Sequence, residues 1–329
     1  ETMQPDIQKA TPEGIAKAAC AIKEGQVAAF PTETVYGLGA DATNANAVAR
    51  VFETKGRPRF NPLIAHVPSL EAANRLVELP PALQRLVTQL WPGPLTVVAP
   101  QRLSNGICDL ATAGLPTLAV RVPVNQTARA LLEAVGRPIV APSANTSGRP
   151  SPTQAAHVAA DFADHDLLIL DDGPCALGLE STIIGLDSDD TLTLLRPGAI
   201  PSARVEQIAN QPLNRIGPIS QNAPTAPGQL TSHYAPHAHL RLNATDLHPG
   251  EAVIEFGPPT RDGGVSEGAI IMNLSPTGDL REAAANLFKA LRTIDQFGHA
   301  KVAVVPIPNE GLGEAINDRL ARAAAPRSN

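Results

Sequence analysis

A short cationic loop is the first candidate for chemistry in this sequence. Lys55, Arg57 and Arg59 fall within five residues of one another, in the stretch 55–62. One glycine and two prolines in this stretch oppose a helix and stiffen the backbone. A rigid loop with several cations could bind the phosphates or the carboxylate of a ligand. A solvated charged turn is the alternative, and the loop alone does not decide between the two.

Two polar runs could supply further ligand contacts. Residues 31–41 place Thr32 and Thr34 directly after an apolar run that predicts a strand. Residues 141–148 read Ala-Pro-Ser-Ala-Asn-Thr-Ser-Gly and lie shortly before a helix expected at 153–162. Hydroxyl and backbone N–H groups near a helix N-terminus can hold anionic oxygens. Each run could also be an ordinary solvated turn.

Two arginines lie in or next to apolar strands. Arg121 is inside the run 119–122, and Arg196 ends the run that begins at Leu192. Burying an arginine is costly unless its charge is paired. We therefore expect Arg121 either to emerge at a strand end or to meet a carboxylate, and a ligand carboxylate would serve.

Several familiar enzyme motifs are absent or weak. No G-x-x-x-x-G-K-[ST] sequence occurs, so a P-loop is excluded, and any ATP site must bind phosphates with side chains. Gly37-x-Gly39-x-x-Ala42 resembles a dinucleotide fingerprint, but polar residues separate it from the expected strand. The stretch 178–182 lacks the G-x-S-x-G order of a serine hydrolase.

The histidines predict no metal site. His233, His237 and His239 are close in sequence, but Pro236 interrupts the helix that would align them, so we expect a surface loop. His66 ends an expected strand and is interpreted as a core or rim histidine, unless the cationic loop lines the same cleft.

Composition limits the class of protein. Hydrophobic residues make up 43% and aromatics 3% of 329 residues, which predicts aliphatic cores. A net charge of −6 and a pI near 5.8 disfavour nonspecific nucleic-acid binding. Three scattered cysteines without a CxxC predict neither a disulfide framework nor a zinc site. No secretory leader or membrane-spanning run is visible, so we expect a cytoplasmic protein.

The pattern of helices and strands predicts an α/β protein with two domains. The expected helices include 46–54, 69–77, 82–90, 126–135, 153–162, 203–210, 280–297 and 313–323. The expected strands include 27–30, 63–67, 95–99, 117–122, 138–141, 167–170, 182–186, 192–195, 252–256, 269–274 and 301–306. We place the first domain at 12–198, a linker at 199–237, and a small α/β domain, Rossmann-like in element order, at 238–325.

Seven ordered stretches together closely resemble the YrdC-type L-threonylcarbamoyladenylate synthases. These stretches are 31–39, 55–66, 91–96, 119–123, 142–148, 178–182 and 195–200. Ala-Pro-Gly at 226–228 and Ser-His-Tyr-Ala-Pro at 232–236, with the second domain, resemble the long two-domain form. The resemblance covers residues 12–325.

The resemblance implies a twisted mixed sheet with a concave, positively charged cleft, and a defined reaction. L-threonine, bicarbonate and ATP, accompanied by Mg²⁺, would give threonylcarbamoyl-AMP and pyrophosphate. Partner proteins would then transfer the threonylcarbamoyl group to the adenosine beside the anticodon of certain tRNAs. No covalent nucleophile is needed, and catalysis would rest on positioning and electrostatics.

The same resemblance implies roles for individual residues. The residues expected to bind threonine are Thr34, His66, Arg121 and Ser181. Those expected to surround ATP are Lys55, Arg57, Asn61, Thr117, Ser143, Asn145, Ser151 and Arg196, with Tyr234 reaching in from the linker. Lys55 and Arg57 would be the catalytic cations, and Arg59 is expected to be solvated.

Two departures and two other functions remain open. Gly185 stands where many relatives carry an acid, and residues 229–231 lack a basic residue found in some relatives. An RNA- or ribosome-binding module that uses the basic cleft is one alternative, although stable nucleic-acid binding is not expected. A carbamoyl-adenylate enzyme with another amino donor is the second. We also expect the linker to act as a lid.

Overall fold

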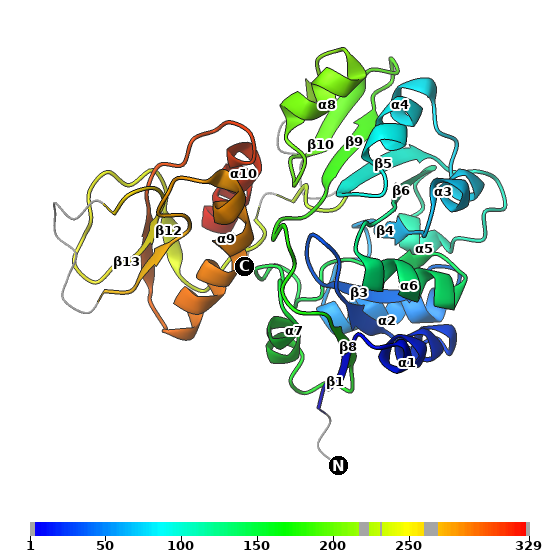
Figure 1. Ribbon diagram of the computed structural model, residues 1–329, viewed down its shortest axis with the longest axis horizontal. Helices are drawn as coiled ribbons and strands as arrows, with labels where there is room; N and C mark the ends of the chain where they lie inside the picture. Colours follow the sequence, from blue (N-terminus) through cyan, green and yellow to red (C-terminus); the bar gives the residue numbers. More distant parts are fainter. Residues whose placement is uncertain (1–3, 217–223, 231, 260–268, 327–329) are drawn as a thin grey trace.

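Two β-sheets organise the chain in the computed structural model, which describes residues 4–216, 224–230, 232–259 and 269–326 (Figure 1). The large sheet has eleven strands in these residues, in the order β1-β8-β2-β3-β7-β4-β6-β5-β9-β10-β11. The strands are β1 (Asp6–Lys9), β2 (Ala28–Phe30), β3 (Gly37–Asp41), β4 (Ile64–His66), β5 (Leu95–Pro100), β6 (Thr117–Arg121), β7 (Ile139–Val140), β8 (Leu168–Asp171), β9 (Thr182–Leu186), β10 (Leu192–Arg196) and β11 (Asn214–Arg215).

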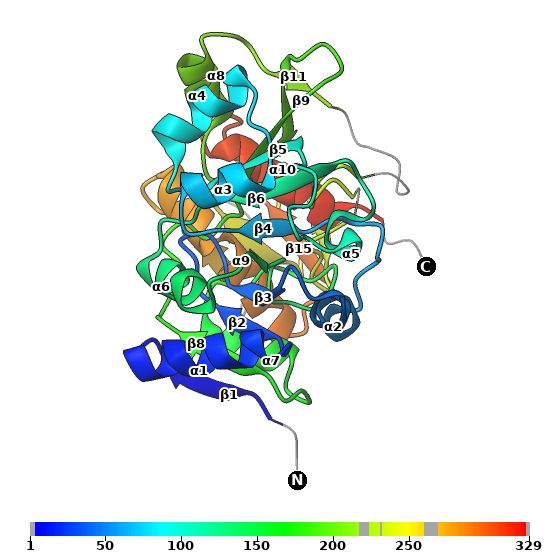
Figure 2. The same cartoon turned by 90° about the vertical axis from the view of Figure 1, so that its right-hand side faces the viewer.

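Helices cover both faces of the large sheet. They are α1 (Pro12–Lys23), α2 (Ala45–Lys55), α3 (Leu70–Leu76), α4 (Pro81–Leu90), α5 (Asp109–Thr112), α6 (Gln126–Val135), α7 (Ala155–Asp161) and α8 (Ser202–Ala209). Ala28 and Phe30 of β2 pack with α1 and α6, while Ala29 packs with α2. Because neighbouring strand residues point to opposite faces, α6 and α2 lie on opposite sides of the sheet (Figure 2).

The small sheet has the order β12-β15-β13-β14 and is parallel throughout in the described residues. Its elements are β12 (His239–Arg241), β13 (Ala252–Glu255), β14 (Ile271–Asn273), α9 (Leu280–Gln296), β15 (Lys301–Val304) and α10 (Gly313–Ala324). The predicted fold class, a mixed sheet with helices and a smaller α/β unit, is confirmed. None of the helices in the described ranges is long and apolar enough to cross a membrane.

Most predicted elements are found close to their expected bounds, and β3 is the main exception. The helix at 126–135 and the strand at 182–186 are confirmed at their predicted bounds. No strand was expected at residues 37–41, where an ordinary turn was one of two interpretations, but these residues form a strand that pairs antiparallel with β2. A Cβ at Gly39 would lie 2.7 Å from the ring of Phe30. The glycines therefore make room for an aromatic ring inside a sheet, which also argues against a dinucleotide loop.

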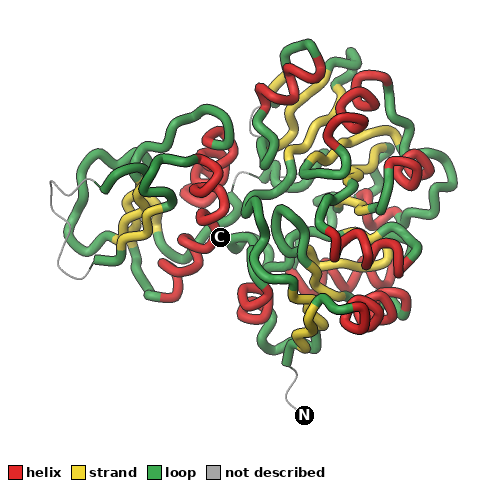
Figure 3. Tube along the Cα trace, in the orientation of Figure 1, coloured by secondary structure: helices red, strands yellow, loops and turns green. Residues whose placement is uncertain are grey.

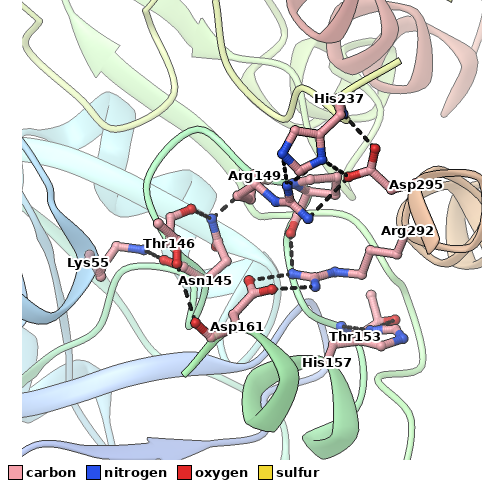
Figure 4. A network of polar contacts seen from close by, with 11 residues as sticks. Lys55, Asn145, Thr146, Arg149, Thr153, His157, Asp161, His237, Arg292 and Asp295 are labelled. Carbon is pink, nitrogen blue, oxygen red and sulfur yellow. Dashed lines mark hydrogen bonds and ion pairs between the residues drawn. The ribbon is translucent and has the colours of Figure 1, made fainter. Parts of the chain in front are cut away.

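Helices α9 and α10 face the large sheet across a region that consists mostly of loops (Figure 3). Both oxygens of Asp161, at the end of α7, accept hydrogen bonds of 2.9 Å from Arg292 of α9 (Figure 4). Arg149 forms a second ion pair with Asp295 of α9, at 3.1 Å. The first ion pair is buried and joins α9 to α7, and the second is partly exposed and joins α9 to the loop that follows β7.

Candidate functional site

The turn between β2 and β3 is rigid and polar. The hydroxyl of Thr32 accepts hydrogen bonds from the backbone N–H groups of Thr34 and Val35 and donates to the carbonyl of Val35. Thr34 in turn accepts a 3.0 Å hydrogen bond from the guanidinium of Arg121. The turn therefore fixes one hydroxyl group beside an arginine.

Arg121 ends β6, is buried and meets a carboxylate of the protein, so both alternatives that the sequence left open apply to it. The carboxylate is that of Glu33, and its second oxygen accepts N–H groups from Val124 and Asn125. Glu33 was not among the residues expected at the site, although an acid shortly after a buried strand was a signal for it. The Nε of Arg121 has no hydrogen-bond partner within the described residues.

His66 lies beside Arg121 on the neighbouring strand, and the two residues are register partners. Burial, together with the charge of Arg121, lowers the pKa of His66 to about 3. The imidazole is therefore neutral at ordinary pH. Its Nδ1 is 3.2 Å from the carbonyl of Ile64, which makes Nδ1 the protonated nitrogen and leaves Nε2 as an acceptor.

Ser181 precedes β9 and connects two further strands. Its hydroxyl is 2.7 Å from that of Thr96 on β5, and Arg196 of β10 donates to its carbonyl and hydroxyl. Gly198 permits this approach, because a Cβ there would lie 2.4 Å from the carbonyl carbon of Ser181. Ser181 and Arg196 therefore line the same cavity as Thr34 and Arg121.

The two predicted catalytic cations occupy different positions. Lys55 ends α2 and is 2% exposed. Its ammonium donates to the carbonyl of Asn145 at 2.5 Å (Figure 4) and to that of Ser143, also at 2.5 Å. Burial and the nearby charge of Arg57 hold the pKa of Lys55 well below its usual range. Lys55 therefore supports the 141–148 loop from behind.

Arg57 lines the cavity. One Nη donates to the carbonyl of Pro62 at 3.0 Å, and its Nε has no partner in the described part of the chain. Burial lowers the pKa of Arg57 to about 10, so the side chain stays charged at neutral pH. Arg59 is exposed, which confirms the expectation that it is solvated.

Besides Lys55, four of the residues expected at ATP do not line this cavity. Asn61 and Asn145 are buried, and each has a side-chain oxygen without a partner among the described residues. The hydroxyl of Ser151 donates to Glu180 at 2.5 Å. Thr117 begins β6 and lies at the opposite end of that strand from Arg121.

The cavity has a volume of about 50 Å³ and lies between the large sheet and the linker. Pro227 and Gly228 lie over Arg196, and a Cβ at Gly228 would be 2.7 Å from that side chain. The lining residues are Thr34, Val35, Arg57, Ile64, His66, Arg121, Ala141, Pro142, Ser143, Glu180, Ser181, Arg196, Pro227, Gly228, His233 and Tyr234.

Tyr234 reaches the cavity from the linker, as expected. It is 2% exposed, and its ring centroid is 4.0 Å from that of His233 and 5.5 Å from that of Phe288. The surface-loop prediction was wrong for His233, which is buried on the cavity wall, because the linker folds back onto the sheet. It holds for His237, whose ring is exposed and pairs with Asp295.

Glu180 also lines the cavity, although it was not among the expected site residues. Its two oxygens accept hydrogen bonds from Ser151 and from Arg319 of α10. Burial alone would raise the pKa of Glu180, but the charges of Arg319 and Arg196 outweigh burial and lower the pKa. The carboxylate is therefore ionised. An acid inside the 178–182 motif was the only available signal.

Comparison with known proteins identifies the family. Residues 20–198 match the family model Sua5_yciO_yrdC, described as telomere recombination, and residues 200–325 match the C-terminal domain of threonylcarbamoyl-AMP synthase. The threonylcarbamoyl-AMP synthase of Pyrococcus abyssi is 41% identical over 326 residues, which cover 93% of this chain and 92% of that protein. This chain belongs to the threonylcarbamoyl-AMP synthase family. The family predicted from the sequence is confirmed.

Other members of the family agree over the whole chain. The threonylcarbamoyl-AMP synthase of Bacillus subtilis is 38% identical over 95% of this chain and 93% of its own length. The crystal structure of P. abyssi Sua5 with L-threonine has a TM-score of 0.86, at 37% identity, and covers 97% of both chains. These matches favour the synthase over the RNA-binding alternative.

Both departures from the family pattern have a structural account. The side-chain oxygen of Gln229 accepts N–H groups from Thr225 and Ala226, so this residue shapes the linker instead of facing the cavity. A Cβ at Gly185 would lie 2.8 Å from Leu195, so any side chain there requires a shift of that leucine. Thr231, the third residue of the linker departure, lies outside the described residues.

Proposed function

We propose that this protein synthesises threonylcarbamoyl-AMP and pyrophosphate from L-threonine, bicarbonate and ATP. One observation carries the proposal: three arginines and a neutral histidine from separate strands and loops converge on a single cavity. Anionic substrates need such cations, and the related enzymes named above have this activity in their names.

Threonine would bind at the Arg121 side of the cavity. The free Nε of Arg121 and the Thr34 hydroxyl suit a carboxylate, because charge-assisted hydrogen bonds are strong in a buried site. The Nε2 of His66 can accept a hydrogen bond from the threonine hydroxyl or amine. Ser181 would close this side of the site.

ATP would bind toward Arg57 and Arg196. The threonine amine and bicarbonate would form a carbamate with loss of water. A carbamate oxygen would then attack the α-phosphorus, an O–P bond would form, and the bond from that phosphorus to the pyrophosphate oxygen would break. Charge on the phosphate oxygens would be stabilised by Arg57, and Lys55 would hold the loop that carries Ser143 and Asn145. The remaining residues proposed to surround ATP are Asn61, Thr117, Ser151, Arg196 and Tyr234.

Magnesium would enter with ATP and not as a resident metal. In the described ranges no three His, Cys, Asp or Glu side chains come together as a ligand set. Glu180, the acid on the cavity wall, is already bonded to Arg319 and Ser151. Phosphate oxygens and water are the usual ligands of Mg²⁺ in such sites.

The linker would act as a lid over the substrates. A cavity of about 50 Å³ has room for a few water molecules but not for ATP and threonine together. Residues 227–228 and 233–234 must therefore move when the substrates enter. Protection of residues 226–235 from proteolysis by ATP plus threonine would support this movement, and unchanged cleavage would contradict it.

Domain limits at 12–198, 199–237 and 238–325 are part of the proposal. The strands up to β11 belong to the large sheet and those from β12 onward to the small sheet, so the proposed linker begins with α8 and β11, which pack with the large sheet. The product would be passed, in the cytoplasm, to proteins that transfer the threonylcarbamoyl group to tRNA.

Pyrophosphate release from purified protein tests the proposed function. We expect release from ATP only when L-threonine and bicarbonate are both present. Release that ignores threonine would contradict the proposal. Serine or carbamoyl phosphate in place of threonine tests whether another amino donor is used.

A further inference from the structure

Helix α10 of the small unit contacts the cavity wall through Arg319. This side chain is 0% exposed, its Nε donates to Glu180 at 2.8 Å, and its guanidinium carbon lies 5.1 Å from the centre of the Tyr234 ring. Glu180 and Tyr234 both line the cavity. One arginine from the small unit therefore contacts two walls of a site that is otherwise built by the large sheet and the linker.

The contact with Arg319 matters because Glu180 carries a negative charge on the wall of the cavity. Among the described residues that line the cavity, Glu180 is the one acid, and it is close enough to Arg196, a residue assigned to ATP, for that charge to lower its pKa. A buried carboxylate without its cation is strongly unfavourable, and it would repel an anionic ligand. Arg319 removes that repulsion by pairing with the Glu180 carboxylate.

The same helix also holds the linker. Arg322 donates to the carbonyl of Leu230 at 2.5 Å, and its own carbonyl accepts the N–H of His233 at 3.2 Å. Asp318 pairs with both Arg319 and Arg322. The linker residues on either side of position 231 are therefore anchored to α10.

We propose that Arg319 is a positioning residue of the synthase site, which keeps Glu180 neutralised at the phosphate end of the cavity and supports Tyr234 of the linker. The small unit thereby completes the ATP side of the site. This inference rests on the proposed function.

The competing explanation is that Arg319 only attaches the small unit to the large sheet. Arg215 provides a matched control, because it is also an arginine that joins the two units through a carboxylate of α10. It lies on β11, pairs with Glu314 and is half exposed, and it does not line the cavity. If attachment alone matters, loss of Arg215 and loss of Arg319 should affect catalysis alike.

The decisive experiment compares steady-state kinetics of Arg319→Met, Arg215→Met, Glu180→Gln and the double variant Arg319→Met/Glu180→Gln. For Arg319→Met we expect the KM for ATP to rise at least tenfold, with less than a threefold change in the KM for threonine. The double variant should recover an ATP KM within threefold of Glu180→Gln, because it removes the unpaired carboxylate. Arg215→Met should stay within twofold of the unchanged protein.

Two outcomes would overturn the inference: equal ATP KM values for Arg319→Met and Arg215→Met, or a double variant no better than Arg319→Met. If Arg319→Met does not fold, Arg319→Lys takes its place. It keeps a cation for Glu180, so its ATP KM should stay within threefold, and a tenfold rise would reject charge compensation.

Calorimetric titration with ATP separates this inference from the proposed function. If the unchanged protein binds ATP but releases no pyrophosphate with threonine and bicarbonate, the proposed function fails. The Kd values for ATP across the same variants still test Arg319. A pattern of loss and rescue supports the inference, and equal Kd values reject it.

Discussion

The large and small sheets are both α/β layers, yet they use their strand ends differently. Around the cavity, β4, β6 and β10 end in His66, Arg121 and Arg196, each buried and polar. In the small sheet, β13 and β14 end in Glu255 and Asn273, and the amide of Asn273 is bonded within the unit. Only the first set gathers charge on a shared cavity.

The comparison shows that the small unit contributes through its helices instead of its strand ends. Parallel sheets commonly bind ligands beyond the carboxyl ends of their strands. Here the hollow beside Val304 is lined by aliphatic and amide side chains. Arg292 and Arg319 instead extend from α9 and α10 toward the large sheet. Each prediction below tests this division of roles.

Replacing Arg57 by alanine should have the largest effect. Arg57 lines the cavity, and loss of one preorganised cation at a developing phosphate charge costs about 3–4 kcal/mol. Pyrophosphate release should therefore fall by roughly 10²–10³-fold. Arg59→Ala, two residues away and exposed, is the matched control and should stay within twofold. Comparable losses in both variants would show that the loop acts through its net charge alone.

Replacing Gly178 by alanine should destabilise the packing of α9 against the large unit. Gly178 has φ +69°, and a Cβ would lie 2.5 Å from the Cα of Ala285 in α9. Gly173 has φ +78° with no atom within 4 Å of a Cβ, so Gly173→Ala shares the backbone strain of about 1–2 kcal/mol without the clash. We expect Gly178→Ala to lose roughly 1–3 kcal/mol more. Urea unfolding measures this difference. Equal midpoints for the two variants would mean that α9 can shift to make room for the added methyl group.

Acid should destabilise the cavity through its neutral histidines. Burial lowers the pKa of His66 and His233 to about 3 each, below the value of an unfolded histidine. Between pH 6.5 and 3 the unfolded chain binds protons that the folded chain does not. The free energy of unfolding therefore keeps its full value above pH 6.5 and falls as the pH decreases. Each histidine contributes up to about 1.4 kcal/mol per pH unit.

Urea midpoints at pH 7.5 and 5.0 measure this loss. His66→Gln and His233→Gln should each make the dependence on pH shallower. His239→Gln, an exposed residue of the small sheet, should leave it unchanged. If the urea midpoint changed with pH by the same amount in all three variants, the role of the cavity histidines would be contradicted.

The sequence predicted the parts of the molecule that depend on local pattern. The periodicity of residues 126–135 gave α6, and the apolar run at 182–186 gave β9. Strand β3 was missed because Gly37-Leu38-Gly39 has low strand propensity, and pairing with β2 and β7 decides its conformation. The cost of burying Arg121 limited it to a strand end or a carboxylate partner, but did not indicate that the carboxylate would be Glu33.

The remaining site residues depend on contacts between distant segments. Nothing in the sequence pairs Arg121 with Glu33, 88 residues earlier, or Glu180 with Arg319, 139 residues later. His233 seemed to belong to a surface loop because only the packing of the linker against α10 buries it. The role of the small unit could not be predicted for the same reason, because its arginines pair with carboxylates of the large unit that are distant in sequence.

The smallest expected effect concerns the hollow of the small unit. The amide of Asn317 lies in this hollow and donates to the carbonyl of Ile307 at 3.0 Å. Asn317→Ala removes this hydrogen bond, which should cost about 1 kcal/mol of stability. Because α10 would keep Arg319 in place, kcat/KM for ATP should remain within twofold. A tenfold loss of kcat/KM with an unchanged urea midpoint would mean that the strand ends of the small sheet do serve the reaction, and the contrast between the two sheets would no longer hold.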